Sequence, residues 1–399
     1  MKKSVKILRW LVAVLLALVL ATGIAVWAMW HNEISTLMSI ELLKDRSDAH
    51  LDGAVYTMDV SGGFYLEDFL AQGGVSDDGQ LIQFVTDHLT KGLIPISMES
   101  PEIGCSSFTG RTADGDVLFG RNYDFSKTNT VIVRTHGGGE RHSTISTVDL
   151  QFLSIDTEKN VESLMDKIIM LAAPYAPLDG INDAGVSCGI YMTYQGGETT
   201  VATDQNTDKP DFTSTTLLRL ILDYADNVEE AVEIAAAFDL HDSAMTSYHY
   251  MVADASGRSA ILEWVGDTDA TDNDGAARRL VVTYNDSDDH IGKNEAASDS
   301  QVITNFILQP GYYEGSDAEA KKGFDRYEQL WADVNAVQGV FGSEEEAMAL
   351  LETVGRRSWK NDDKNGCTVH SVIYNLTDRT ALWVPNENFQ EPGYVFDFR

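Results

Sequence analysis

Three residue types that could support nucleophilic catalysis occur close together at Cys105, Arg121 and Asp124. The run 112–116 between them is rich in turn-forming residues and lies between two stretches with strand character, which predicts a β-hairpin. The hairpin would return Arg121 and Asp124 to the neighbourhood of Cys105. Because a nearby cation lowers the pKa of a thiol, this spacing predicts a reactive cysteine, whereas a cysteine without such neighbours is usually a small buried hydrophobe.

The sequence gives little support for metal or cofactor chemistry. In the acidic run 267–275, counting back from Gly275 puts Ala270 at the first ligand position of a calcium-binding loop and Val281 at the position of its bidentate glutamate, so that pattern fails. We expect a solvated turn there instead. No His-Glu-x-x-His motif occurs, and His249 and His370 are expected in strands as hydrogen-bonded structural residues. We therefore predict no metal and no cofactor.

The remaining cysteines are Cys188 and Cys367. An exported chain of this size that depended on disulfides would usually contain more cysteines. We predict that both are small buried residues in strands. A disulfide between them is the alternative.

Composition indicates a folded, exported protein. The 399 residues are 43% hydrophobic and carry a formal charge of −33, and all acidic side chains lie outside the first thirty residues, which contain only basic ones. A surface of this charge repels phosphate backbones, so nucleic-acid binding is not expected. The uncharged run 10–30 is long enough to span a bilayer and predicts a signal anchor that leaves the following chain outside the cell membrane. A signal peptide cleaved near Ala28 is the alternative, and the protein would then be secreted.

The rest of the chain alternates between strand and helix patterns. Residues 31–104 mix both kinds and predict a pro-segment or N-terminal subunit, with strands at 54–59 and 63–66 and a helix at 81–93. In residues 105–399 the strands cluster at both ends with helices grouped between them and near the end, which favours an α+β fold of antiparallel sheets with helices on their faces. The predicted strands are 105–111, 117–125, 131–135, 143–150, 248–253, 260–265, 280–284, 368–376 and 380–384, and the predicted helices are 161–171, 214–224, 228–238, 318–337 and 344–354.

Three sequence blocks carry a family resemblance. The Cys105 block, the run Gly-Arg-Asn-x-Asp-Phe at 120–125 and the run Gly-x-Asn-x-x-Gly at 180–185 resemble the choloylglycine hydrolase and linear amide C–N hydrolase superfamily. This superfamily includes bile salt hydrolases, penicillin V acylases and acid ceramidase. The resemblance covers residues 105–399 and implies the N-terminal nucleophile hydrolase fold, a four-layer αββα sandwich, here preceded by one transmembrane helix.

The resemblance also implies a mechanism. The precursor would be cut between Gly104 and Cys105, so that one residue supplies both a thiol and an α-amine base. Carried over by position, Arg121 would hold the cysteine and face the substrate, and Asp124 would orient the new amine. The remaining catalytic roles would fall to Asn285, which would donate to the oxyanion, and to Arg326, which would support the cysteine pocket.

Substrate contacts are expected around Asn182, Tyr191, Met192 and Tyr194. Bile salt hydrolases carry a second asparagine ten residues after the position matching Asn182, where this chain has Met192. A backbone N–H or the side chain of Tyr191 would have to replace that oxyanion donor. The hydrophobic residues in this region suit an acyl chain or an aromatic acyl group.

The predicted activity is hydrolysis of a small N-acyl substrate at its linear amide bond. Candidate substrates are bile salts, penicillin V, N-acyl amino acids, acyl-homoserine lactones and N-acyl lipids. Two alternatives remain open: an acyltransferase that passes the cysteine-bound acyl group to an amine, and a non-catalytic surface binding module. The predicted partners are the substrate and, through the N-terminal helix, the membrane, and a homo-oligomer is possible.

Overall fold

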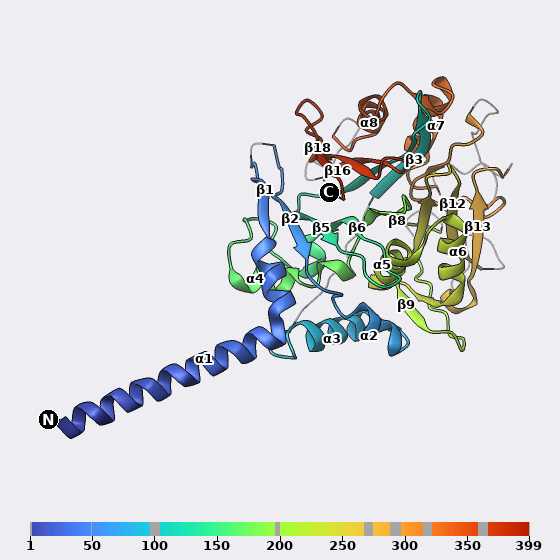
Figure 1. The fold of residues 1–399 in the computed structure, drawn as a ribbon. Helices are drawn as coiled ribbons and strands as arrows, with labels where there is room; N and C mark the ends of the chain where they lie inside the picture. Colours follow the sequence, from blue (N-terminus) through green and yellow to red (C-terminus); the bar gives the residue numbers. More distant parts are fainter. Residues whose placement is uncertain are drawn as a thin grey trace.

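A computed structural model describes the chain at residues 2–48, 50–95, 104–195, 200–266, 274–287, 297–313, 321–357 and 366–398 (Figure 1). The helices are α1 (Lys2–Ser39), α2 (Leu66–Ala71), α3 (Asp78–Leu89), α4 (Leu164–Met170), α5 (Ser214–Tyr224), α6 (Val228–Ala237), α7 (Phe324–Ala336) and α8 (Glu344–Thr353). The strands are β1 (Glu41–Lys44), β2 (Val55–Val60), β3 (Gly104–Thr112), β4 (Val117–Ser126), β5 (Thr130–Thr135), β6 (Thr144–Asp149), β7 (Asp179–Asn182), β8 (Ser187–Met192), β9 (Asp211–Thr213), β10 (Asp239–His241), β11 (Tyr248–Ala253), β12 (Ser259–Val265), β13 (Arg279–Tyr284), β14 (Val302–Ile303), β15 (Val340–Phe341), β16 (Gly366–Asn375), β17 (Thr380–Pro385) and β18 (Tyr394–Phe396).

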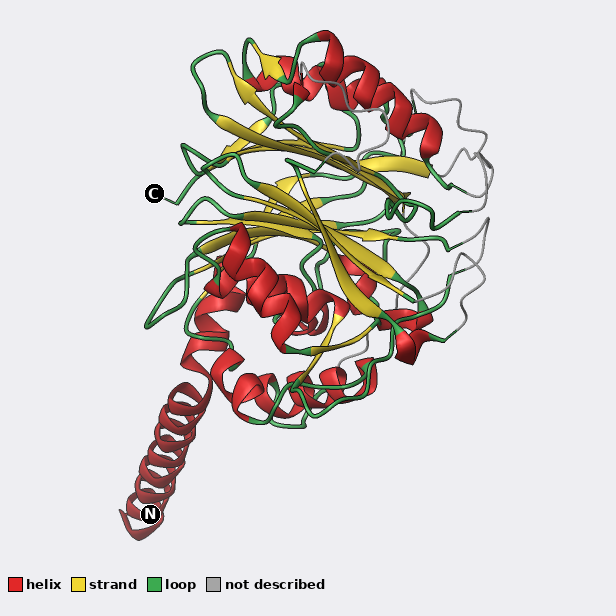
Figure 2. Cartoon of the chain, turned by 90° about the vertical axis from the view of Figure 1, so that its right-hand side faces the viewer, coloured by secondary structure: helices red, strands yellow, loops and turns green. Residues whose placement is uncertain are grey.

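Two β-sheets stack face to face and are covered on their outer sides by helices (Figure 2). The nine-stranded sheet has the order β1-β2-β5-β6-β7-β8-β11-β12-β13, and the seven-stranded sheet has the order β14-β3-β4-β16-β17-β18 with β15 beside β3. Helices α5 and α6 pack on the larger sheet, whereas α7 and α8 pack on the smaller one. The predicted α+β architecture of four layers, helix, sheet, sheet and helix, is confirmed.

The main core fills the space between the sheets. Strand residues that are apolar on the inward face bury their side chains there, as expected when two sheets pack face to face. Cys188 and Cys367 are both buried and unbridged, so the prediction of small structural cysteines is confirmed and the disulfide alternative is wrong.

The sequence pattern predicted antiparallel sheets, but three strand pairs in the described part of the chain are parallel. Strand β2 runs parallel to β5, β9 runs parallel to β10, and β15 runs parallel to β3. The parallel pairing of β2 has a topological cause, since the chain leaves β2 and passes through α2, α3 and β3–β4 before it enters β5.

The strand predicted at 63–66 is wrong, because the chain turns there and then forms α2. Phe64 and Tyr65 have φ angles of 38° and 62°, which interrupt an extended backbone. Leu66 and Phe69 then lie one helical turn apart and are both buried. This cluster of aromatic and aliphatic side chains forms a second, smaller core under the nine-stranded sheet.

The N-terminal segment belongs to the same folded body as the rest of the chain. β1 and β2 form one edge of the nine-stranded sheet, and β2 pairs with β5 along its full length. The last turns of α1 also pack on β2, where the Thr36 hydroxyl accepts the N–H of Ser61.

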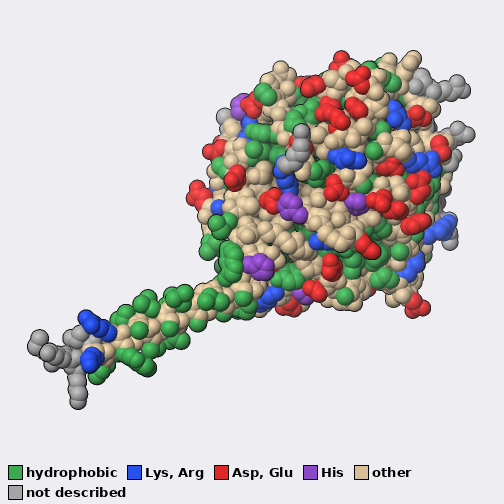
Figure 3. Space-filling view, viewed as in Figure 1, with side chains coloured by type: hydrophobic (Ala, Val, Ile, Leu, Met, Phe, Trp, Pro, Cys, Tyr) green, Lys and Arg blue, Asp and Glu red, His purple; other side chains and the backbone are tan. Residues whose placement is uncertain are grey.

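The first part of α1 extends away from the body as an apolar rod with Lys and Arg side chains at its far end (Figure 3). Residues Arg9–Ser39 are long and apolar enough to cross a membrane by length and composition, and an 18-residue window within them has a mean hydropathy of 2.6. A signal sequence has the same two properties, so both alternatives for residues 1–30 stay open.

Candidate active site

The predicted hairpin forms from β3 and β4 and sets the positions of Cys105, Arg121 and Asp124. Its antiparallel register pairs Gly104 with Asp124, Cys105 with Tyr123, and Ser107 with Arg121. Alternation along the strands directs Cys105 and Arg121 to the same region between the two sheets. The hairpin prediction is confirmed, and it brings Cys105 and Arg121 into contact.

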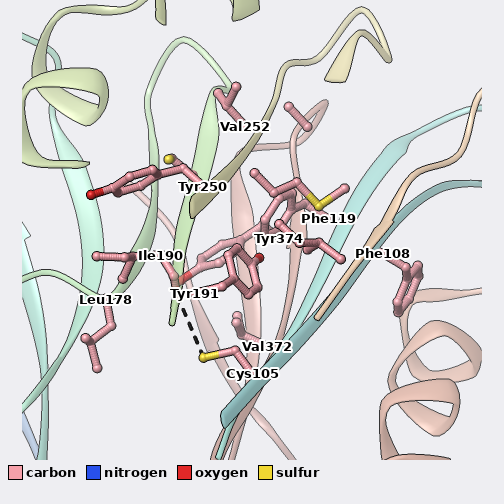
Figure 4. Packing of buried hydrophobic residues seen from close by; sticks show 14 of the residues in the cluster. Cys105, Phe108, Phe119, Leu178, Ile190, Tyr191, Tyr250, Val252, Val372 and Tyr374 are labelled. Carbon is pink, nitrogen blue, oxygen red and sulfur yellow. Dashed lines mark hydrogen bonds between the residues drawn. The ribbon is translucent and has the colours of Figure 1, made fainter. Parts of the chain in front are cut away.

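The thiol of Cys105 is fully buried between the sheets. Its Sγ lies 3.4 Å from Nη2 of Arg121. It also lies 3.8 Å from the carbonyl oxygen of Ile190 on the facing sheet (Figure 4). Burial raises the pKa of Cys105 to about 11, although the positive charge of Arg121 acts in the opposite direction. In the intact chain this thiol is therefore protonated at neutral pH.

Arg121 is held by a buried ion pair with Asp179 of the opposite sheet. Nε of Arg121 lies 2.8 Å from Oδ2 of Asp179, and both side chains have no exposed surface. Nη2 of Arg121 donates to the carbonyl of Ile190 at 2.6 Å. The guanidinium is thus fixed by a carboxylate and a carbonyl, and the same Nη2 also contacts the thiol.

Asp179 is itself satisfied by two further side chains. His370 lies 2.7 Å from its Oδ2, and the Tyr374 hydroxyl donates to its Oδ1 at 2.6 Å. Burial alone would raise the pKa of Asp179, but His370, Arg121 and Tyr374 together lower it to about 2. Asp179 stays ionised at every pH at which the protein would work, which keeps Arg121 charged and in place.

A glycine on β8 allows Arg121 to approach this closely. A Cβ atom at Gly189 would lie 2.7 Å from Nη1 of Arg121 and 2.8 Å from the hydroxyl of Tyr191, so a larger residue would collide with both. Tyr191 stacks on the guanidinium with its ring centroid 4.3 Å from Cζ, and its hydroxyl donates to Ser107 at 2.5 Å. Arg121 is therefore packed from the side as well as bonded at its ends.

The backbone of Cys105 is held by two polar residues. Its N–H donates to Oδ1 of Asn305 at 3.0 Å, and its carbonyl accepts from Nη1 of Arg326 at 2.9 Å. Nη2 of Arg326 also donates to Oδ1 of Asn305 at 2.8 Å. The nitrogen of the Gly104–Cys105 peptide bond thus lies directly beside Asn305.

Asp124 lies on the other side of this peptide bond. Its Oδ2 pairs with Nη1 of Arg326 at 3.1 Å, and its Oδ1 accepts from the Thr368 hydroxyl at 2.6 Å. A Cβ atom at Gly104 would lie 3.2 Å from Cβ of Asp124 and 3.5 Å from its Oδ2. The absence of a side chain at Gly104 lets the carboxylate approach the peptide bond.

The structure does not bring Asn285 to Cys105. Asn285 follows the edge strand β13, and two strands separate β13 from β8, which corresponds to about 14 Å. Its side chain donates to the carbonyls of Gly257 and Asp299 at 2.9 Å each. These contacts join a turn to a loop, away from the thiol.

Asn182 also lies away from the thiol and organises the turn between β7 and β8. Its Oδ1 accepts the N–H groups of Ala184 and Val186, and its Nδ2 donates to the carbonyls of Leu222 and Ala225 on and after α5. All four contacts are to the backbone, as expected for a side chain that shapes a turn.

The other predicted substrate residues lie at the end of β8 beside the thiol. Tyr191 contacts Arg121 as described, and the carbonyl of Met192 accepts from Nδ2 of Asn305 at 2.8 Å. The N–H of Tyr194 donates to the backbone carbonyl of Asn305 at 3.1 Å. Asn305 therefore connects the end of β8 to Cys105.

Sequence reasoning missed Asn305 and Asp179. Asn305 follows the two-residue strand β14, too short for a periodic signal, although β14 pairs with β3 just after Cys105. Asp179 directly precedes the Gly-x-Asn-x-x-Gly run at 180–185, and this position next to the run was the available signal. His249 and His370 are buried in β11 and β16 and hydrogen-bonded, as predicted.

No cluster of three or more His, Cys, Asp or Glu residues with metal-binding geometry occurs in the part of the chain that the structure describes. Most of the acidic run 267–275 lies outside that part. The solvated turn predicted there stays a prediction.

Comparison with known families gives a match that begins at Cys105. Residues 105–268 match the model described as linear amide C–N hydrolases, choloylglycine hydrolase family. This segment is similar to the choloylglycine hydrolase family. The match includes the hairpin, Asp179 and β8, and it supports amide hydrolysis as the kind of chemistry. No curated protein matches the chain.

Solved structures of several amidohydrolases are similar to this chain. They include a mutant conjugated bile acid hydrolase from Clostridium perfringens, with 15% identity, a TM-score of 0.47, and coverage of 74% of this chain and 92% of that one. A penicillin V acylase from Agrobacterium tumefaciens has 16% identity, a TM-score of 0.44, and coverage of 74% and 86%. A Caenorhabditis elegans orthologue of N-acylethanolamine-hydrolyzing acid amidase has 14% identity, a TM-score of 0.38, and coverage of 73% and 100%.

The buried ion pair leads to a pH-dependent stability prediction. Replacing Asp179→Asn leaves the guanidinium of Arg121 buried without its counter-charge, which should reduce the free energy of unfolding at pH 7 by about 3–5 kcal/mol. Because the pKa of Asp179 is lowered in the folded state to about 2, its contribution is complete above about pH 4 and is lost as the pH falls towards 2.

Urea unfolding of both proteins between pH 2 and pH 7 measures this effect. The difference between wild type and Asp179→Asn should narrow below pH 4. The control Asp48→Asn removes exposed contacts to Arg46 and Lys127 and should change stability much less. An Asp179→Asn protein as stable as wild type at pH 7 would contradict the structural role of this pair.

Proposed function

We propose that this protein is an exported amidohydrolase that acts on small N-acyl substrates and uses Cys105 as its nucleophile after cleavage of the Gly104–Cys105 bond. The observation that carries the proposal is the set of polar side chains that contact Cys105. Arg121 contacts the thiol of Cys105, while Asn305 and Arg326 bind its backbone. The family match supports the same bond type and begins at the same residue.

Cleavage would convert the buried thiol into an active nucleophile. In the intact chain the pKa of Cys105 is raised by burial to about 11, and its nitrogen is an amide without basicity. Attack of Sγ on the Gly104 carbonyl would move the acyl bond from nitrogen to sulfur, and water would then hydrolyse this thioester to a Gly104 carboxylate. The freed α-amine, with an unperturbed pKa of about 7.7–8.0, is suited to accept the thiol proton at neutral pH.

The same groups would then act on a substrate amide. Sγ of Cys105 attacks the amide carbonyl, the α-amine transfers the proton to the leaving nitrogen, and water hydrolyses the thioester to release the acid. Arg121 would stabilise the developing thiolate. Asp124 lies beside Gly104 and would hold the new ammonium group.

Asn305 is the residue that we propose as the oxyanion donor in place of Asn285. Its Oδ1 accepts from the Cys105 N–H at 3.0 Å and from Arg326, while its Nδ2 donates one hydrogen to the Met192 carbonyl at 2.8 Å and would donate the other to the oxyanion. A donor held by two partners is preorganised and does not need to move during the reaction. The backbone carbonyl of Met192 would hold the amide of Asn305 in place. Tyr191 and Tyr194 would border the acyl-binding region.

The cut would divide the chain into two parts that stay together. We propose that residues 31–104 remain bound to residues 105–399 as an N-terminal subunit, because β2 pairs with β5 and the smaller core contains side chains from both parts. We further propose that α1 anchors the protein in the membrane with the catalytic body outside. The strongly negative body and the basic N-terminus are consistent with that orientation.

Processing can be tested on the purified protein. Mass spectrometry should find two chains, one of which begins at Cys105, and they should elute together in size-exclusion chromatography. Cys105→Ala should remain a single chain because the attacking thiol is absent. Cys188→Ala removes another fully buried thiol and should be cut like wild type. Active protein with an intact Gly104–Cys105 bond would contradict the mechanism.

The oxyanion assignment can be tested by comparing two asparagines. In fully cut protein, Asn305→Ala should lower kcat by about 10²–10³, because one oxyanion donor is lost. Asn285→Ala serves as the matched control and should leave kcat within a few-fold of wild type. The measurement is amine release from whichever member of a panel of N-acyl amides is turned over. A large loss in Asn285→Ala with none in Asn305→Ala would reverse the assignment.

A further inference from the structure

A cavity of about 400 Å³ lies beside the end of α1, separate from the residues around Cys105. Its walls come from the last turns of α1, the turn before α2, the loop between β5 and β6, and the ends of α3 and α4. The side chains that give it chemical character are Glu33, Tyr65, Glu67, Asp68 and Arg141. Its volume lies in the range of small-ligand sites.

Arg141 carries buried donors without partners in this cavity. Nε and Nη1 are both buried, and neither has a hydrogen-bond partner among the described residues. Its Cζ lies 5.3 Å from the ring centroid of Phe64, and that contact satisfies no N–H group. Buried donors of a charged group are costly to leave unpaired, so this guanidinium is suited to bind an anionic ligand group.

Three carboxylates line other parts of the same cavity. Glu33 is buried and accepts the Tyr65 hydroxyl at 2.5 Å. Glu67 and Asp68 are exposed at the start of α2, and no ion pair joins them to a cation in the described part of the chain. The cavity therefore offers a cationic region at Arg141 and an anionic region at Glu67 and Asp68, which suits a zwitterionic ligand.

The cavity lies close to the point where α1 would leave the bilayer. The uncharged stretch of α1 ends at Trp30, whose Nε1 donates to the carbonyl of Leu89 and ties the helix to the body. The helix is kinked at Trp30, and Asn32 and Thr36, which line the cavity, follow the kink by two and six residues, or at most about 9 Å along the helix that continues from it. That range overlaps the headgroup layer, which is about 5–8 Å thick on each side of the hydrocarbon.

Exposed apolar side chains lie around the same end of the molecule. Leu93, just beyond α3, is 72% exposed, and Leu164 at the start of α4 is 67% exposed. Both helices lie beside the exit of α1 in Figure 1. Contact with the bilayer surface would cover these residues.

We propose that this cavity binds the headgroup of a membrane phospholipid that carries a phosphate and a primary ammonium, with the phosphate at Arg141 and the ammonium at Glu67 and Asp68. The proposal rests on the proposed membrane anchor. A purely anionic headgroup fits less well, because the body is strongly negative and the cavity contains more carboxylates than cations. A bound headgroup would also fix the height of the catalytic body above the membrane.

Native mass spectrometry of the full chain in detergent tests this binding. Phosphatidylethanolamine, phosphatidylcholine and phosphatidylglycerol are added separately, and soluble phosphoethanolamine distinguishes a free ligand from a membrane lipid. Phosphatidylethanolamine should bind at least tenfold more tightly than phosphatidylglycerol. Equal binding of all three lipids, or binding of soluble phosphoethanolamine at the affinity of the lipid, would overturn the proposal.

Variants locate the binding to this cavity. Arg141→Gln should weaken phosphatidylethanolamine binding at least tenfold, and Glu67→Gln with Asp68→Asn should remove the preference over phosphatidylglycerol. The control Arg258→Gln removes surface ion pairs with Glu229 and Asp286 in the turn before β12 and should bind as wild type does. Unchanged binding by Arg141→Gln would overturn the proposal.

Two further measurements keep the test interpretable. Thermal unfolding without lipid identifies a variant that has failed to fold. If Arg141→Gln fails to fold, Arg141→Lys replaces it. This variant keeps the positive charge but should bind the lipid several-fold more weakly, because it lacks the planar set of donors of the guanidinium. Mass determination of the N-terminus shows whether α1 is retained. A chain cleaved after Ala28 would refute the anchor, and failure of short-chain phosphatidylethanolamine to bind that chain would refute the cavity proposal separately.

Discussion

The buried ion pair between Arg121 and Asp179 is the interaction on which the candidate site depends. Arg121 belongs to the smaller sheet and Asp179 to the larger one, so the pair joins the two halves of the sandwich. Removing two charges from water costs several kcal/mol per ion, and the pair is tolerable only with good geometry and further hydrogen bonds. His370, Tyr374 and the Ile190 carbonyl supply those bonds. The thiol of Cys105 lies against Nη2 of the same guanidinium, the nitrogen that also donates to the Ile190 carbonyl.

This arrangement explains why one set of residues could serve both self-cleavage and substrate turnover. Asn305 and Arg326 bind the peptide unit of Cys105 while the chain is intact, and the same groups would surround the new amine and the substrate carbonyl after the cut. Because each group is fixed by a partner outside the site, the loss of one peptide bond need not disturb it. Residues 31–104 contribute to the larger sheet, so the sandwich would keep its edge strands after cleavage.

The sequence predicted what local patterns can encode. The turn residues at 112–116 specified the hairpin and hence the contact between Cys105 and Arg121, because register follows from the turn. Asn305 could not be found in this way, since it reaches Cys105 only through a two-residue strand and a separation of 200 residues. Asn285 was assigned the oxyanion role from its resemblance to the family's asparagine, but it follows β13, and the strand order places β13 at the far edge of the sheet. The helix α2 was hidden for a similar reason, because its start depends on the positive φ angles of Phe64 and Tyr65.

The central claim is that Cys105 carries the acyl group during turnover, and trapping that intermediate tests it most directly. Cut protein is mixed with an N-acyl amide that it hydrolyses, quenched in acid within one turnover time, digested, and mapped by mass spectrometry. The account predicts the mass of the acyl group on the peptide that begins with Cys105 and its removal by hydroxylamine, as expected for a thioester. Amine release without any acyl adduct on Cys105, or with the adduct on another residue, would contradict it.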